Sequence, residues 1–220
     1  EMKVSRPVRL QRLTPALAVE VTGRAHSQAS ESSQNRAVTR HAAVAWRSLL
    51  VPMLAVWALQ RMLALVVTIV AARLAHTGIG PEALLQRWAQ WDATWYVAIA
   101  QHGYYSTAST AFFPLYPALT AALAHVVGSN ALLAALLLAN AASLAALLGI
   151  GLLAAHEDGT VNAGTRAMLA MSAYPLAFFL VAPYADNLLL ASAIFALYFA
   201  RRGEWGWAAC CGVVAGLSRP

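Results

Sequence analysis

The stretch that decides the fold is RWAQWDATWYVAIAQHGYYSTASTAFFPLYP, residues 87–117. It gathers aromatic rings, a carboxylate, a histidine and paired prolines between long runs of Ala, Leu and Val. On a helix, Trp88, Trp91 and Trp95 would share one side, with Asp92 beside them. Because tryptophan favours the boundary between membrane and water, the pattern predicts a helix that lies on a bilayer surface.

The second half of this stretch predicts a turn and a new helix. Gly103 is well placed to end the first helix, because glycine tolerates the backbone conformation that closes a helix. FFPLYP follows a Ser/Thr linker, and a proline in a first helical turn would start a second short apolar helix over residues 112–127.

The composition is that of an integral membrane protein. Hydrophobic residues make up 60% and charged residues 11%, with a mean hydropathy of +0.59, whereas charged residues are about 25% of a soluble domain. Eight of the fifteen basic residues lie in the first 47 positions, so the net charge of +6 indicates a cytoplasmic flank. We therefore expect a multi-pass cell-membrane protein with a cytoplasmic N-terminus and no nucleic-acid partner.

Apolar runs divide the chain into a tail and a membrane domain. Residues 1–44 have no apolar period and predict a disordered basic cytoplasmic tail, and residues 45–220 predict an all-α polytopic transmembrane bundle. The predicted spans are 48–72, 131–155, 166–183, 188–201 and 206–220. The tail and the Arg201-Arg202 pair should lie on one side, so residues 112–127 should not cross. We place them as an interfacial or re-entrant helix in an outer loop, residues 75–130.

Polar residues within the predicted spans suggest contacts between helices. Arg61 lies near the middle of span 48–72, where a charge costs about 3 kcal/mol. It should therefore face the bundle or a water-filled cavity, or else reach along the helix to the surface. Asn140 and Ser143 predict hydrogen bonds between helices, and Tyr174-Pro175 predicts a kink. Gly212 and Gly216 have GxxxG spacing, a weak packing signal.

No metal site or cofactor is predicted. His156, Glu157 and Asp158 are consecutive, so their side chains point in different directions on one turn, and no fourth ligand is evident. Cys210 and Cys211 are adjacent in an apolar run and predict inert packing residues.

Several segments together resemble a known family. WDATWYVAIAQHGY, FFPLYP, AYPLAFFLVAPYADNLLLA, RRGEW and GLSRP resemble the PIG-V-type mannosyltransferases, which are similar to other GT-C glycosyltransferases. The resemblance covers residues 50–220, and the WD, HGY and FFPLYP combination is its most specific part. Family members often have Tyr-Ser-Glu where this chain has Tyr184-Ala185-Asp186, and Ser-Asn-Gly or Pro-Thr-Gly after the arginine that matches Arg219.

The resemblance implies a GT-C-like fold of which this chain is the N-terminal part. It implies transfer of mannose from a polyprenyl-phosphate sugar to an acceptor hydroxyl on the extracytoplasmic face, with inversion and with Asp92 as general base. A phosphate leaves without needing a proton, so one carboxylate can suffice. The alternative for Asp92 is a plain exposed helix residue among anchoring tryptophans. The expected partners are the bilayer, the lipid-linked donor and an envelope glycan, glycolipid or protein acceptor. The single lysine and abundant arginine and alanine favour a GC-rich bacterial genome.

The remaining candidate residues have two interpretations each. Trp91, Trp95 and Tyr96 are candidate substrate-binding residues or interfacial anchors. His102 is a candidate phosphate or acceptor contact, or an ordinary residue at a helix end. Tyr184 and Asp186 follow a predicted span on the same side as Asp92 and are candidate substrate contacts. Arg219 would bind the donor phosphate through its planar fork, or would mark the end of a span.

A rival hypothesis is a non-enzymatic transporter or scaffold with an aromatic interfacial anchor. In it, Asp92 and Asp186 line a path for an ion or solute. Both carboxylates are predicted at the outer surface, whereas coupling residues of transporters usually lie near the membrane midplane.

Overall fold

The described part of the chain is all helical. The computed structural model describes residues 46–219, which belong to one compact unit, Val44–Pro220. No strand occurs among these residues, which confirms the predicted all-α class. The helices are Trp46–Leu74, α2 (Pro81–Gln86), α3 (Asp92–His102), η1 (Ala108–Ala111), α4 (Leu115–Val126), α5 (Ala131–Asp158), α6 (Val161–Ala173), η2 (Ala177–Leu180), α7 (Asp186–Arg201) and α8 (Trp205–Ser218). The predicted tail, residues 1–44, lies outside the described residues.

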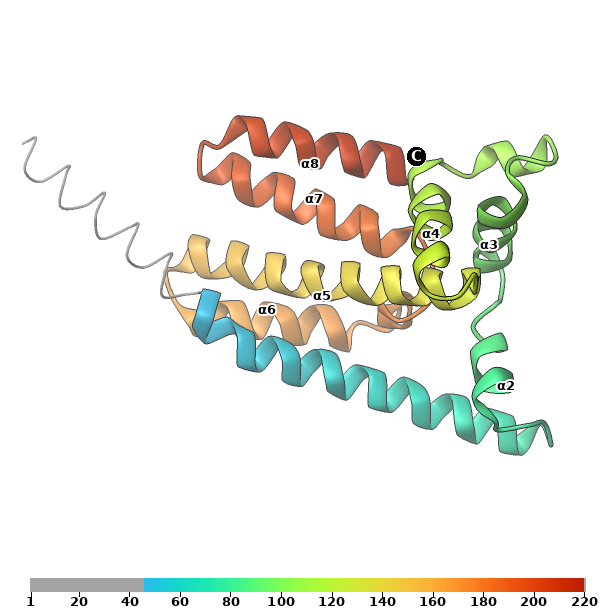
Figure 1. Ribbon diagram of the computed structural model, residues 1–220. Coiled ribbons are helices and arrows are strands. Elements are labelled where there is room, and N and C mark those ends of the chain that lie inside the picture. Colours follow the sequence, from blue (N-terminus) through green and yellow to red (C-terminus); the bar gives the residue numbers. More distant parts are fainter. Residues whose placement is uncertain (1–45, 220) are drawn as a thin grey trace, which may run out of the picture. The chain divides into compact units, whose positions relative to one another are not determined.

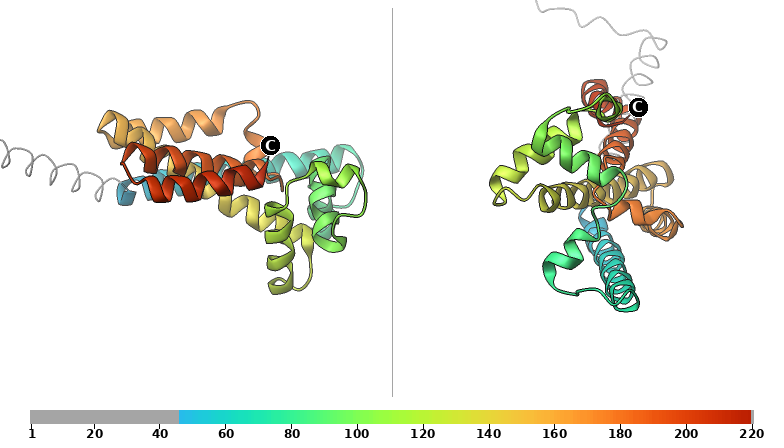
Figure 2. Two further views of the ribbon diagram at one scale, coloured as in Figure 1. Left: turned by 90° about the horizontal axis from the view of Figure 1, so that it is seen from above. Right: turned by 90° about the vertical axis from the view of Figure 1, so that its right-hand side faces the viewer.

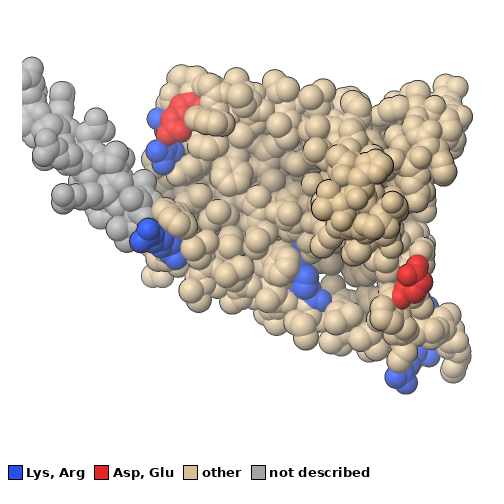
Figure 3. Space-filling model, in the orientation of Figure 1, with Lys and Arg blue, Asp and Glu red and all other residues tan. Residues whose placement is uncertain are grey.

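Two helices are long and apolar enough to cross a membrane. Trp46–Leu74 has 29 residues and a hydropathy of 2.0, and α5 has 28 residues and a hydropathy of 2.2. Half of the most apolar 18-residue segment of α5 is buried in the unit, compared with 11% of the corresponding segment of Trp46–Leu74. The first helix therefore turns most of its apolar side chains outward. On the face drawn in Figure 3, charged side chains gather mainly toward the two ends. These features indicate association with a membrane.

One of the later predicted spans, 166–183, is shorter than expected, whereas α7 covers the whole of predicted span 188–201. Residues 166–183 do not form one helix, because α6 starts at Val161 and ends at Ala173. Thr160 caps its start by accepting the Ala163 N–H, and Pro175 forces Tyr174 into an extended conformation (φ −64°, ψ 138°) that ends it. The expected kink is thus a break. The 13 residues of α6 rise about 20 Å, less than the ~30 Å of a hydrocarbon core.

Helix α5 is the centre of the unit, and glycines let its neighbours approach closely. A Cβ on Gly164 of α6 would lie 2.6 Å from the backbone oxygen of Gly151 of α5, and a Cβ on Gly151 would meet Met168. By contrast, a Cβ on Gly212 or Gly216 would meet no atom within 4 Å among the described residues. Close packing therefore occurs between α5 and α6, and the GxxxG spacing of α8 has no packing partner in the described unit.

The helix ends fall into two groups. The start of the Trp46–Leu74 helix, the turn from α5 to α6 and the turn from α7 to α8 lie at one end, and α2, α3 and α4 lie at the other (Figure 1). An ion pair joins the ends of α5 and α7, with Arg201 Nε 3.4 Å from Glu157 Oε1. Residues 47 and 201 therefore lie at the same end of the unit. An even number of passes between them would give this arrangement.

Residues 87–103 do not form one continuous helix, because only residues 92–102 of this stretch are helical before Gly103. Helix α2 ends at Gln86 and α3 begins at Asp92, with Trp91 between them at φ +47°. Trp88, Trp91 and Trp95 therefore do not share one helix side, because the chain turns at Trp91. Gly103, at φ +73°, ends α3 as predicted.

The second short helix forms where the prolines predicted it. Helix α4 starts after Pro114 and holds Pro117 in its first turn, where the missing N–H leaves no hydrogen bond unmade. Its 12 residues are too few to cross a bilayer. Both α3 and α4 run crosswise to α5, α7 and α8 in the views of Figures 1 and 2.

Candidate functional site

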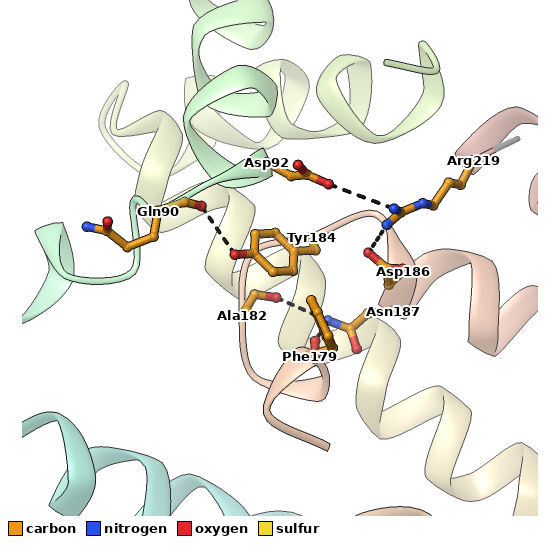
Figure 4. A network of polar contacts seen from close by, with 8 residues as sticks. All are labelled: Gln90, Asp92, Phe179, Ala182, Tyr184, Asp186, Asn187 and Arg219. Atoms are coloured by element: carbon orange, nitrogen blue, oxygen red, sulfur yellow. Dashed lines mark hydrogen bonds and ion pairs between the residues drawn. The ribbon is translucent and has the colours of Figure 1, made fainter. Parts of the chain in front are cut away.

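Three charged side chains from distant parts of the chain meet at the end of the unit that carries α3 and α4 (Figure 4). The Arg219 guanidinium donates a hydrogen bond from Nη1 to Asp186 Oδ2. Its Nη2 lies 3.9 Å from Asp92 Oδ2, which is an ion-pair distance but too long for a hydrogen bond. The structure therefore brings together three of the residues that the sequence singled out.

Helix termini place these groups. Asp92 and Asp186 are the first residues of α3 and α7, where a carboxylate interacts favourably with the free N–H groups of the first turn. Arg219 follows the last residue of α8 in an extended conformation. Helices α7 and α8 are joined by a short turn, so the end of α8 returns to the beginning of α7 and to Asp186.

The three side chains remain accessible. The side chains of Asp92, Asp186 and Arg219 are 40%, 33% and 37% exposed. The hydrogen bond to Arg219 uses an oxygen of Asp186, whereas the Asp92 carboxylate makes no hydrogen bond with any described residue. One carboxylate thus accepts a hydrogen bond from the guanidinium, and the other forms only a longer ion pair with it. This arrangement can hold an anion at the arginine and accept a proton at Asp92.

Tyr184 connects the two sides of the charged group. Its ring is buried, and its hydroxyl donates to the Gln90 carbonyl at 3.2 Å. Burial raises the pKa of Tyr184, and the negative charges of Asp92 and Asp186 raise it further. The phenol therefore stays protonated and keeps donating its hydrogen bond at neutral pH. We conclude that Tyr184 joins the segment before α7 to the segment before α3.

Asn187 is a site residue that was not among the candidates predicted from the sequence. Its side chain is buried, and Nδ2 donates to the carbonyls of Phe179 (2.8 Å) and Ala182 (3.2 Å), which fixes the loop in front of α7. Its Oδ1 is buried without a partner among the described residues. The signal for it was an amide directly after Asp186 in an otherwise apolar run.

The aromatic residues of α3 pack against the loop that follows them. Trp95 stacks with Tyr105 (centroids 6.0 Å apart) and with Phe112 (5.5 Å). Tyr96 meets Phe112 and Tyr116 edge-on and is only 2% exposed. Burial raises the pKa of Tyr96 to about 12. This placement favours a packing role for Tyr96.

Two other candidate residues, Trp91 and His102, are exposed, and His102 also lies away from the charged group. Trp91 is 73% exposed at the turn before Asp92. His102 is exposed at the last position of α3. Asp92 and His102 occupy opposite ends of this 11-residue helix, which puts their backbones about 15 Å apart. The structure therefore does not bring His102 to the carboxylates.

An apolar cavity of about 330 Å³ lies beside the loop in front of α7. Its walls come from α6, η2 and α7, and include Met171, Tyr174 and Leu190, with Asp186 and Asn187 among the lining residues. Within residues 46–219, no group of three or more His, Cys, Asp or Glu side chains could hold a metal ion.

Comparison with known proteins gave no relative for this chain: no family model, no curated protein and no solved structure matches it.

Proposed function

We propose that the protein is a membrane glycosyltransferase that moves a hexose, mannose in the first instance, from a polyprenyl-phosphate donor to an acceptor hydroxyl with inversion. The observation that carries the proposal is the pairing of Arg219 with Asp186 beside a second carboxylate, Asp92, that has no hydrogen-bond partner among the described residues. The motif resemblance noted above supports the same activity.

In the proposed reaction, the acceptor oxygen attacks the anomeric carbon of the sugar. The bond from that carbon to the phosphate oxygen breaks, and polyprenyl phosphate leaves with the electron pair. Asp92 takes the proton of the acceptor hydroxyl, which is the role of a general base. Phosphate is a stable anion at neutral pH, so the leaving group needs no acid.

Arg219 would bind the phosphate of the donor. A guanidinium offers two parallel N–H groups to an anion, and Asp186 holds that fork in place from one side. Asp186 and Tyr184 would then orient Arg219 and Asp92 and need not touch the reacting atoms.

The proposed setting is a GT-C-like polytopic fold with the site on the extracytoplasmic face and the N-terminus in the cytoplasm. The grouping of helix ends supports this setting, because the charged group lies opposite the turns that carry Glu157 and Arg201. Helices α3 and α4 would lie in the outer interface beside the site. The acceptor would be an envelope glycan, a glycolipid or a protein.

The rival function is transport of an ion or solute, and one observation favours it. Arg61 places a charge in the middle of a helix that is long and apolar enough to span a membrane, and charges at that depth often mark a transport path. Uptake of a solute by vesicles that lack any polyprenyl donor would support this rival.

The test of the proposed function supplies labelled polyprenyl-phosphate mannose to membranes that contain the full-length protein. We expect label to appear in a glycan, glycolipid or protein fraction, and not in membranes without the protein. Failure of every fraction to acquire label, with labelled polyprenyl-phosphate glucose and galactose as well, would refute the proposal.

A further inference from the structure

The Arg61 guanidinium points into the unit and binds only uncharged groups. Its Nε donates to Asn140 Oδ1 (2.7 Å) and its Nη1 to Gln60 Oε1 (2.8 Å). Its Nη2 donates to Ser143 Oγ and to the Leu180 carbonyl (2.7 Å). No carboxylate of the described residues forms an ion pair with it. Of the two alternatives considered for Arg61, the structure shows the one in which it faces the bundle.

The acceptors on α5 are fixed by their own hydrogen bonds. Asn140 donates from Nδ2 to the Leu136 carbonyl at 2.7 Å, which leaves Oδ1 toward Arg61. The Asn140 carbonyl accepts from Ser143 Oγ and from Trp57 Nε1. The guanidinium carbon of Arg61 also lies over the Trp57 ring, 4.6 Å from the ring centroid. Asn140 and Ser143 therefore bond between helices, as predicted, and hold the arginine in one orientation.

Gln60 and Arg61 together hold the two ends of η2. Gln60 Nε2 donates to the carbonyl of Ala177, the first residue of η2, at 2.9 Å. Arg61 donates to the carbonyl of Leu180, its last residue. A single short helical turn leaves carbonyls without partners inside it, and buried carbonyls need them. Two adjacent side chains of the first helix supply these partners.

The segment that follows η2 leads directly into the charged group. Residues 181–185 are all buried, and the next residue is Asp186. From the other side, Asn187 donates back to the Phe179 and Ala182 carbonyls. The segment is therefore fixed at η2 by Gln60 and Arg61 and at α7 by Asn187. Tyr184 and Asp186 lie within this short buried connection.

We propose that Gln60 and Arg61 are positioning residues that fix η2, and through it place Tyr184 and Asp186 against Asp92 and Arg219. The uncharged surroundings of Arg61 support this role over ion binding, because its donors are used on carbonyl, amide and hydroxyl groups of the protein itself. The effect on sugar transfer rests on the proposed function, whereas the effect on the η2 segment does not.

The first experiment measures how often the segment after η2 becomes accessible, and it needs no sugar donor. Cys210 and Cys211 are replaced by alanine, Ala182→Cys is added as a buried probe, and its reaction with a maleimide is timed in membranes. Arg61→Met should speed the reaction by about tenfold or more, the effect of losing a buried charged hydrogen bond. Gln60→Met should act in the same direction by less.

Arg202→Met is the matched control, because Arg202 also holds neighbouring polar groups but lies in the turn between α7 and α8. It should leave the reaction rate of the probe unchanged. Gln60→Met keeps the arginine and its partners on α5, so it tests the proposal even if Arg61→Met fails to fold. An unchanged rate in Gln60→Met, or an equal increase in Arg202→Met, would overturn the proposal.

The second experiment measures sugar transfer by a double-mutant cycle. If Arg61 acts through Asp186, Arg61→Met should lower kcat less in the Asp186→Asn background than in the parent. Equal losses in both backgrounds would mean a general loss of structure and would contradict the positioning role. Faster probe labelling in a protein whose parent form transfers no sugar would refute the proposed function alone.

Discussion

Tyr184 donates its hydroxyl hydrogen to the backbone carbonyl of Gln90, a contact between residues 94 positions apart in the sequence. The contact ties the loop in front of α7 to the turn in front of α3. Since Asp186 and Asp92 begin those two helices, this hydrogen bond contributes to the spacing of the two carboxylates around Arg219.

Removing this hydrogen bond should loosen the charged group without unfolding the protein. Tyr184→Phe keeps the buried ring, so we expect a loss of about 0.5–1.5 kcal/mol in stability and a several-fold fall in sugar transfer. Thermal unfolding in detergent and transfer assays measure the two effects. Tyr174→Phe is the control, because Tyr174 is exposed and makes no hydrogen bond among the described residues through its hydroxyl. Equal effects of the two variants would contradict the role of Tyr184.

Arg219 should be replaceable by lysine only in part. A lysine keeps the positive charge, but it lacks the fork that reaches Asp186 and Asp92 from two nitrogens. We expect Arg219→Lys to keep some sugar transfer and Arg219→Gln to lose more, mostly through a higher KM for the lipid donor. Parent-like transfer and donor KM in Arg219→Gln would show that this arginine does not bind the phosphate.

The contact between α5 and α6 should be intolerant of added volume. In Gly164→Ala, the new Cβ would meet the Gly151 oxygen, so we expect a loss of about 1–3 kcal/mol. Gly212→Ala is the matched control, because it adds the same group to a helix where nothing lies within 4 Å. It should be neutral or stabilising by up to about 1 kcal/mol. Thermal unfolding in detergent that ranks the two variants the other way would contradict this packing.

The proposed topology predicts opposite labelling of two exposed positions. In a background without Cys210 and Cys211, Thr107→Cys should react with an impermeant maleimide added outside cells, and Asn162→Cys should react only after the membrane is opened. Labelling of Asn162→Cys in intact cells, or failure to label Thr107→Cys there, would refute the proposed orientation.

Patterns with a local cause were predictable from the sequence. The apolar runs predicted the Trp46–Leu74 helix and α5, and Gly103 predicted the end of α3, because hydropathy and glycine conformation act over a few residues. The charge in an apolar run left two alternatives for Arg61, and the structure shows the one in which it faces the bundle, with partners on α5 and η2.

Features that depend on tertiary packing could not be predicted in this way. The turn at Trp91 interrupts the expected helix. It could not be predicted, because Trp91 has a positive φ although no glycine or proline lies near it in the sequence. Pro175 predicted a kink, but whether a helix continues past a proline depends on neighbouring groups that satisfy the freed backbone atoms, and here α6 ends at Ala173. The role of Asn187 depends on carbonyls that an irregular loop brings to it. The meeting of Asp92 with Arg219 depends on how α8 returns, which no local pattern encodes.

The most direct test of the central claim is sugar transfer by the full-length Asp92→Asn protein. Asparagine keeps the size and hydrogen bonding of the side chain but removes its basicity, and general bases contribute about 10² to 10⁴-fold. Glu82→Gln is the control, since Glu82 is an exposed carboxylate on α2 whose partner is Gln86.

With labelled polyprenyl-phosphate mannose, we predict at least a hundredfold loss of transfer in Asp92→Asn, with normal expression and membrane insertion. The loss should be smaller in Asp186→Asn and absent in Glu82→Gln. Transfer by Asp92→Asn within a few-fold of the parent would contradict the assignment of Asp92 as the general base.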